Sequence, residues 1–304
     1  LSSMEFWKVW QADAQKFVDK HKPLQIEGSL TKKKVQEARK WCEAHDEFTV
    51  TSAYGGHYFS PTQAIWIDAF RQTLPASENE KVVALAGLIE AASKCAAAPG
   101  HTAQPFQPTK TAKAFLEESW NKGVSAYLEG AIKSRAAHFS RKKGKAMVGD
   151  AVVAAKTLAP GDLAFIDPPY SAVHYSRFYH VLETIAAGTC GPVSGVGRYP
   201  APSLRPRSEF SMITTSYSAM KQLLLQVATN GASAIVTFPD HECSNGLSGE
   251  DIRDIAKENF SVEEKLVNSK FSTLGGTKSD LLAGNNRAAR HHATELILRL
   301  TPKG

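Results

Sequence analysis

With 304 residues, of which 42% are hydrophobic and 22% charged, the chain has enough apolar side chains for one large folded domain or two smaller ones. This composition excludes a disordered chain and a small disulfide-stapled scaffold. No apolar run approaches the ~20 residues that a transmembrane helix needs, and the first five residues lack the basic and apolar regions of a signal peptide, so we expect a cytoplasmic protein.

The net charge of +6 is modest, but the basic residues gather in four groups. These are Lys32, Lys33 and Lys34; Arg135, Arg141, Lys142, Lys143 and Lys145; Arg198, Arg205 and Arg207; and Lys278, Arg287 and Arg290. Any single group can be a solvated surface. All four together favour a polyanionic partner.

The cysteines are far apart in the sequence and include no C-x-x-C pair, at Cys42, Cys95, Cys190 and Cys243. We expect reduced, structural thiols. The adjacent residues His241, Glu242 and Cys243 do not predict a metal centre, because three neighbouring side chains rarely face one ion. The sequence therefore predicts no metal site.

Residues 1–145 are predicted to be mainly helical. Apolar residues recur at helical spacing in residues 32–44 and 81–97, and another helical stretch is expected over about 111–137, after an irregular loop. A further helix is expected over residues 61–74, because Ser60 and Pro61 suit an N-cap and a first helical position. Gln63 would then complete a capping box with Ser60.

Short apolar segments alternating with helices predict a parallel α/β sheet in residues 146–304. The expected buried strands lie at residues 146–148, 163–166 and 233–238, with an amphipathic helix at 217–228. Two more strand-like runs, 260–267 and 294–300, have no long helical pattern between them. We expect these two to pair antiparallel at one side of the sheet, and we place the boundary between the two regions near Gly144.

The segment Asp167-Pro168-Pro169-Tyr170 follows the strand-like run 163–166 directly. Ligands of open α/β sheets bind at the carboxyl ends of the strands. There, the Asp167 carboxylate and the Pro168 carbonyl can accept the two N–H groups of an exocyclic amine and draw its nitrogen toward tetrahedral geometry. The prolines fix the backbone, and the Tyr170 ring offers a stacking surface for a base. The alternative is a simple turn that ends the strand.

Residues 167–185 resemble the catalytic loop and following helix of the D12-type adenine-specific DNA methyltransferases. Tyr54-Gly55-Gly56-His57-Tyr58-Phe59, with Ala64, Ile67, Asp68 and Arg71, is similar to a segment found upstream in some members. Residues 88–100, 208–211 and the strand at Ala234 also match in order. The Asp-Pro-Pro-Tyr motif alone is moderately specific, whereas the ordered set is a strong signal.

The resemblance implies a Rossmann-like methyltransferase sheet in residues 146–304, after a helical, DNA-recognising region. It also implies transfer of a methyl group from S-adenosylmethionine to adenine N6 in DNA, after base flipping, with Asp167, Pro168, Pro169 and Tyr170 as catalytic residues. Asp150 and Asp167 are placed at the cofactor, although Asp150 can equally be a helix N-cap. The expected DNA contacts are His174, Tyr175, Arg177, Arg141, Lys142, Lys143, Lys145, Lys278, Arg287 and Arg290. Helix packing is an alternative role for the tyrosines after the loop.

The sequence departs from the family pattern in one respect: no Gly-rich cofactor loop occurs before residue 146. Gly195-Val196-Gly197 does not qualify, because it follows the catalytic loop and no strand precedes it. We therefore expect an upstream segment or a second polypeptide to supply the loop, and S-adenosylmethionine to bind only when it is present.

Two other functions remain open. One is a methyltransferase-like DNA-binding subunit without a cofactor site of its own, and the other is a cytosine-N4 methyltransferase. The resemblance implies a prokaryotic, nucleoid-associated protein in a setting such as restriction-modification or phage defence.

Overall fold

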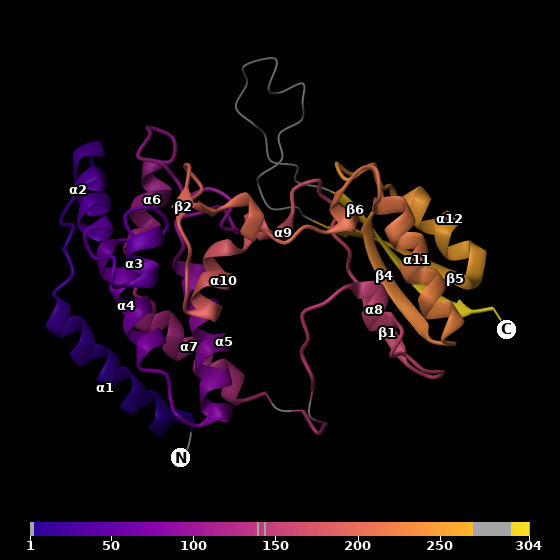
Figure 1. Ribbon diagram of the computed structural model, residues 1–304, viewed down its shortest axis with the longest axis horizontal. Coiled ribbons are helices and arrows are strands. Elements are labelled where there is room, and N and C mark those ends of the chain that lie inside the picture. Colours follow the sequence, from indigo (N-terminus) through magenta and orange to yellow (C-terminus); the bar gives the residue numbers. More distant parts are fainter. Residues whose placement is uncertain (1–2, 139, 143, 270–292, 304) are drawn as a thin grey trace. The chain divides into compact units, whose positions relative to one another are not determined.

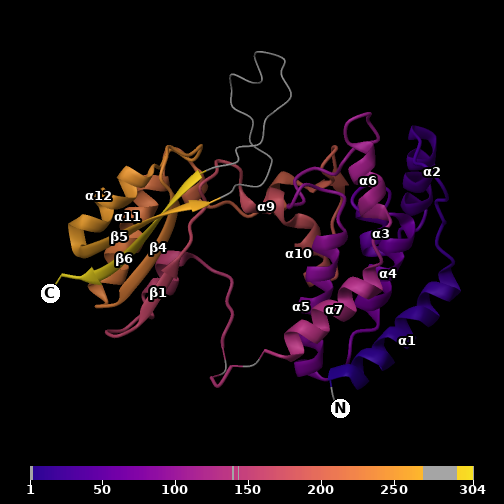
Figure 2. The same ribbon diagram turned by 180° about the vertical axis from the view of Figure 1, so that it is seen from behind.

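The computed structural model describes residues 3–138, 140–142, 144–269 and 293–303. The chain divides into two compact units, whose elements are labelled in Figure 1 and seen from behind in Figure 2. The helical unit comprises residues 1–144 and 176–205, and the sheet unit comprises residues 145–175 and 206–304.

The helical unit consists mainly of α-helices joined by short loops. Its first part contains α1 (Ser3–His21), α2 (Lys32–Glu43), α3 (Thr49–Tyr54), α4 (Pro61–Gln72), α5 (Glu78–Cys95), α6 (Lys113–Trp120) and α7 (Val124–Ala136). The later part contains most of α9 (Tyr175–Phe178), then α10 (His180–Ala187), the two-residue strands β2 (Val193–Ser194) and β3 (Tyr199–Pro200), and the 3-10 turn η1 (Pro202–Leu204).

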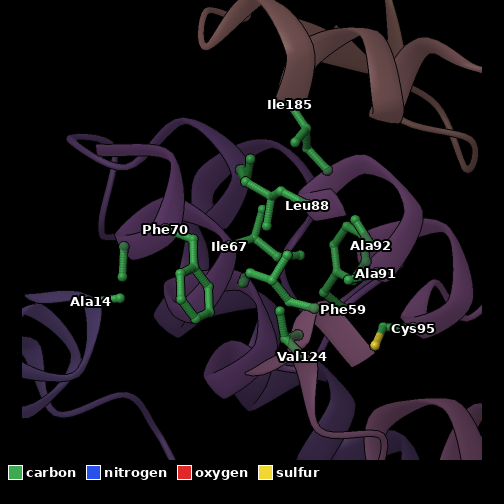
Figure 3. Packing of buried hydrophobic residues seen from close by; sticks show 14 of the residues in the cluster. Ala14, Phe59, Ile67, Phe70, Leu88, Ala91, Ala92, Cys95, Val124 and Ile185 are labelled. Atoms are coloured by element: carbon green, nitrogen blue, oxygen red, sulfur yellow. The ribbon is translucent and has the colours of Figure 1, made fainter. Parts of the chain in front are cut away.

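The core of the helical unit forms where the apolar faces of α1, α4, α5 and α7 meet. Figure 3 shows Ile67 of α4 close to Leu88 of α5, and both side chains are fully buried, as is Phe70 of α4. Val181 and Ile185 of α10 belong to the same buried cluster. This packing explains why residues 176–205 join the helical unit, although the sequence analysis assigns them to the second region.

The capping box predicted at the start of α4 is confirmed. Gln63 Oε1 accepts the Ser60 N–H at 2.9 Å, and Ser60 Oγ accepts the Gln63 N–H at 3.2 Å. Gln63 Nε2 donates to the carbonyls of Ser119 and Lys122, at 2.7 and 2.8 Å. These carbonyls lie where the single helix predicted over 111–137 is broken into α6 and α7. Gly123, the N-cap of α7, favours that break.

The sheet unit is a mixed α/β structure around a four-stranded sheet of order β1-β4-β6-β5. Its elements are α8 (Ala151–Ala155), β1 (Leu163–Ile166), the 3-10 turn η2 (Glu209–Ser211), α11 (Ser216–Thr229), β4 (Ser233–Pro239), α12 (Gly249–Asn259), β5 (Phe260–Ser269) and β6 (Ala293–Pro302). β1 and β4 are parallel, with Ile166 opposite Val236. β6 is antiparallel to both β4 and β5, so the predicted antiparallel pair is confirmed.

One face of the sheet is covered by α11 and α12, which pack against each other (Figures 1 and 2). Alternate residues of β4 and β6 enter this core, namely Ala234, Val236, Phe238, Leu296, Leu298 and Leu300, all of which are buried. The opposite face is different at β1, where Leu163 is 60% and Phe165 is 67% exposed. Among the described residues, β1 pairs only with β4, so its other edge has no neighbouring strand.

The prediction of a strand over residues 146–148 is wrong. These residues form no regular element, and the Val148 side chain is fully exposed. A short apolar run becomes a strand only where a neighbour completes its hydrogen bonds, and no described strand lies beside this one.

Candidate functional site

The candidate site lies at the carboxyl end of β1, where the Asp-Pro-Pro-Tyr segment begins. The two prolines have no N–H to continue the ladder, so β1 ends at Ile166. Because β4 runs parallel to β1, Thr237 lies beside Asp167, and its Oγ1 donates to Asp167 Oδ1 at 3.0 Å. This contact fixes one oxygen of an otherwise exposed carboxylate.

Two acceptors at this strand end carry no hydrogen bond within the described part of the chain. They are Oδ2 of Asp167 and the backbone carbonyl of Pro168. The Pro168 ring is buried, which anchors the backbone, whereas the Tyr170 side chain is 44% exposed. The segment therefore presents two acceptors and an exposed aromatic side chain, and their roles toward a substrate amine and a base stay predictions.

A cleft of about 760 Å³ adjoins this strand end and lies wholly within the sheet unit. Its lining residues are Gly149, Asp150, Ala151, Ala154, Ala155, Leu158, Ala164, Phe165, Ile166, Asp167, Pro168, Pro169, Arg207, Ser208, Glu209, Phe210, Leu223 and Val227. Most of the wall is apolar, and carboxylates stand at three places along it. Such a mixture suits a ligand with an apolar ring and a few polar groups.

Of the two roles that the sequence leaves open for Asp150, the helix N-cap is confirmed, and the cofactor contact stays a prediction. Its Oδ1 accepts the Val153 N–H at 2.9 Å, so it is the N-cap of α8. Asp150 also lines the cleft, and its second carboxylate oxygen has no hydrogen bond to a described residue. The helix cap holds the carboxylate in place at the cleft without using both of its oxygens.

The segment after β4 holds the loop that follows β1. Asn245 is fully buried, and its Nδ2 donates to the carbonyls of Pro169 and Phe210 at 2.8 and 2.9 Å. Ser244 Oγ accepts the Ala172 N–H at 3.1 Å. Sequence reasoning finds neither Asn245 nor Thr237. Thr237 stands out only once β1 and β4 are known to be neighbours, and Asn245 lies in a loop with no motif.

The three residues predicted to contact DNA after the loop lie in different surroundings. His174 Nδ1 accepts the Ser208 N–H at 3.3 Å, so this nitrogen helps to hold the cleft wall. The Tyr175 side chain is 45% exposed. Arg177 belongs to the helical unit, where its guanidinium carbon lies 4.8 Å from the Tyr199 ring centroid. Its side chain is exposed and has no carboxylate partner among the described residues.

Part of the predicted basic surface is described. Arg141, Lys142 and Lys145 are exposed in the irregular stretch around the boundary of the two units, at residues 144 and 145. None of the three forms an ion pair with a described residue. Lys143, Lys278, Arg287 and Arg290 lie outside the described residues.

The helical unit contains the upstream Tyr-Gly-Gly-His-Tyr-Phe segment and the residues matched after it. Their contacts hold helix ends and a turn of this unit in place. Asp68 accepts the N–H groups of Val50 and Thr51 at 2.9 and 2.8 Å, and so caps the start of α3. Burial raises the pKa of Asp68 to about 6. Arg71 donates to the carbonyls of Ile185 and Ala186 at 2.9 and 3.2 Å, at the end of α10.

Gly56 is required by the fold at this turn. Its φ is +71°, and an added Cβ would lie 2.7 Å from the backbone of Arg39. Arg39 Nε donates to the Gly56 carbonyl at 3.0 Å. Burial, with the nearby charges of Arg39 and Arg198, lowers the pKa of His57 to about 3. This motif therefore forms a buried turn within the helical unit.

Gly195-Val196-Gly197 connects β2 and β3, which pair antiparallel. Gly195 has a φ of +72°, and the Gly197 carbonyl accepts from Tyr58 Oη at 2.9 Å and His180 Nε2 at 2.8 Å. The segment is a hairpin turn inside the helical unit. The expectation that no strand precedes this segment is wrong, because the two-residue strand β2 ends at Ser194.

Comparisons with protein-family models, curated proteins and solved structures found no match. Within the described ranges, no three His, Cys, Asp or Glu side chains are grouped to hold a metal ion. The helices described also include none with the length and apolar character to cross a membrane. The family resemblance thus remains a prediction from the ordered motifs.

Proposed function

We propose that the protein is an S-adenosylmethionine-dependent DNA methyltransferase acting on adenine N6. The observation that carries this proposal is a pair of acceptors at a strand end beside the cleft, Asp167 Oδ2 and the Pro168 carbonyl, neither of which accepts a hydrogen bond from a described residue. An amino group conjugated with a ring is a weak nucleophile. Two acceptors that bind its two N–H groups favour the tetrahedral nitrogen of the transition state. Asp167 can also take up the proton that the amine releases.

The cleft fits the methyl donor in size and in chemistry. Its volume of about 760 Å³ lies within the range of roughly 300–1,000 Å³ that is usual for small-molecule sites. Phe210 and Leu223 give it apolar walls, and Asp150 offers a carboxylate oxygen for an amino group of the ligand. S-adenosylmethionine, when bound, would supply an electrophilic methyl group to the substrate nitrogen.

The target base would have to leave the duplex to reach these acceptors, because N6 is enclosed by base pairing and stacking. The Tyr170 side chain follows the acceptors directly and is 44% exposed, so it is suited to stack on a flipped base. The exposed basic residues Arg141, Lys142, Lys145 and Arg177 would then neutralise phosphates. In this proposal the helical unit takes part in DNA recognition.

We further propose that the sheet is part of a larger Rossmann-like sheet. The edge of β1 without a neighbour among the described strands and the exposed Leu163 and Phe165 support this, because apolar sheet edges are normally paired or covered. The proposed occupant is a strand followed by the Gly-rich cofactor loop, from an upstream segment or a second polypeptide.

Calorimetric titration of residues 1–304 with S-adenosylmethionine tests this occupant. Binding is expected to be absent or weak with residues 1–304 alone, and to appear when the upstream segment or the second polypeptide is added. Tight binding by residues 1–304 alone would mean that the cleft is already a complete cofactor site.

The rival function is a DNA-binding subunit that never binds the cofactor, and the open edge of β1 in the described sheet is the observation in its favour. Sequencing that detects modified bases in DNA from cells expressing the gene separates the two. We expect N6-methyladenine at a defined sequence, and its loss in the Asp167→Ala variant. Unmodified DNA in cells that contain the folded protein would favour the binding subunit, and N4-methylcytosine would change the substrate base.

A further inference from the structure

We propose that Asn245 is the positioning residue of the Asp-Pro-Pro-Tyr loop, an inference that rests on the proposed methyltransferase function. Asn245 is fully buried, and its side-chain amide makes three hydrogen bonds. Nδ2 donates one N–H to the Pro169 carbonyl at 2.8 Å and the other to the Phe210 carbonyl at 2.9 Å. Oδ1 accepts the Leu247 N–H at 3.3 Å.

The hydrogen-bond pattern permits only one orientation of this amide. Two of its partners are carbonyls, which need donors, and the third is an N–H group, which needs an acceptor. A buried amide with all of these partners is a rigid support for what it binds.

The two carbonyls that Asn245 binds belong to two separate segments of the candidate site. Pro169 is in the catalytic loop, and Phe210 is in the cleft wall. The single nitrogen of Asn245 therefore fixes the spacing between the loop and the wall.

The hydrogen bond from Asn245 to Pro169 makes the two neighbouring carbonyls, of Pro168 and Pro169, different. The Pro169 carbonyl is occupied by Asn245, whereas the Pro168 carbonyl has no hydrogen bond to a described residue. Fixing the Pro169 carbonyl limits rotation of the backbone that carries Pro168. Asn245 thus keeps the Pro168 carbonyl available to the substrate amine without touching the substrate.

Asn245→Asp is the sharpest test, because it keeps the side-chain shape and replaces both donors by an acceptor. A loop displaced by about 1 Å can lose on the order of 100-fold in rate. We expect a fall of that size in kcat, with the KM for DNA within about threefold of wild type, because the basic residues that would bind phosphates lie outside this loop. Asn245→Ala should behave similarly, since it also removes both donors.

The matched control is Ser216→Ala, which removes the buried hydrogen bond to the Asn245 backbone and leaves the side-chain amide in contact with Pro169 and Phe210. This variant should keep kcat within about threefold. Hydrogen–deuterium exchange adds a readout that does not depend on activity. Peptides covering residues 167–175 should exchange faster in both Asn245 variants than in Ser216→Ala, while peptides from β4 remain protected in all three.

Normal kcat and normal exchange of residues 167–175 in the Asn245 variants would overturn the positioning role and leave the proposed function intact. Equal losses of kcat and of β4 protection in Asn245→Ala and Ser216→Ala would also overturn it, because they would indicate a general effect on the fold. A wild-type protein that transfers no methyl group under any condition would refute the proposed function, and this inference with it.

Discussion

Replacing Asp167 by asparagine tests the acceptor pair with the least change in shape. The amide oxygen of the new side chain would still accept from Thr237, but its NH₂ group would replace the free carboxylate oxygen and turn a donor toward the substrate amine. Loss of one such transition-state hydrogen bond lowers kcat by roughly 100- to 1,000-fold, or about 3–4 kcal/mol. The Asp167 side chain is exposed, so the free energy of unfolding should change by less than about 1 kcal/mol.

The assay is transfer of a labelled methyl group to adenine-containing DNA, measured together with urea unfolding. Two controls bracket the result. Asp162→Asn changes an exposed carboxylate directly before the same strand. This carboxylate accepts the Ala159 N–H, and the variant should keep full activity. Thr237→Val leaves both acceptors present but releases Asp167, and should cost about tenfold or less. Near-normal turnover in Asp167→Asn would refute the reasoning, and the segment would then be a simple turn.

Three further outcomes follow from the structure. Changing Arg141, Lys142 and Lys145 together to alanine should weaken binding to all DNA sequences. The slope of log K for DNA binding against log salt concentration should become shallower by about 0.9 for each phosphate that is no longer neutralised. An unchanged slope would exclude this stretch from the interface. Burial raises the Asp68 pKa to about 6 from an ordinary 3.8, so the folded state binds the proton more tightly, and the free energy of unfolding should fall by about 3 kcal/mol as pH rises from about 3 to 7. Asp68→Asn, which cannot titrate, should lack this fall in urea unfolding. Gly56→Ala should lower the free energy of unfolding by about 2 kcal/mol or more, because Gly56 has a positive φ and an added Cβ would meet the Arg39 backbone. Gly130→Ala, in an open position on α7, should stabilise the protein slightly in thermal melts. Equal effects of the two changes would contradict the assignment of strain to Gly56.

Local patterns predict much of the fold. The capping box at Ser60 and Gln63 is found because it depends only on neighbours in the sequence. The strands at 163–166 and 233–238 are also found, but Leu163 and Phe165 of the first are exposed and not buried as expected. The apolar run 146–148 is not a strand, because strand formation depends on a partner that the run itself does not specify. The break between α6 and α7 is also hidden, since the freed carbonyls are satisfied by Gln63, more than fifty residues earlier.

The candidate site shows the same division. The Asp-Pro-Pro-Tyr motif points to the strand end, and the cleft lies there. Thr237 and Asn245 become visible only when the parallel pairing of β1 and β4 brings residues about seventy positions apart into contact. Asp68 and Arg71 show the opposite: the sequence match singles them out, but the structure gives them contacts at helix ends. Both contacts lie within the helical unit, whereas the cleft lies within the sheet unit.

Nucleoside mass spectrometry tests the central claim most directly. Adenine-containing DNA is incubated with the protein, including any segment or partner that supplies the Gly-rich loop, and S-adenosylmethionine carrying a deuterated methyl group. The account predicts labelled N6-methyladenine in the digested DNA with the wild-type protein and none with Asp167→Asn. Unlabelled adenine with the wild-type protein under conditions where the cofactor is shown to bind, or label found only on cytosine N4, would contradict it.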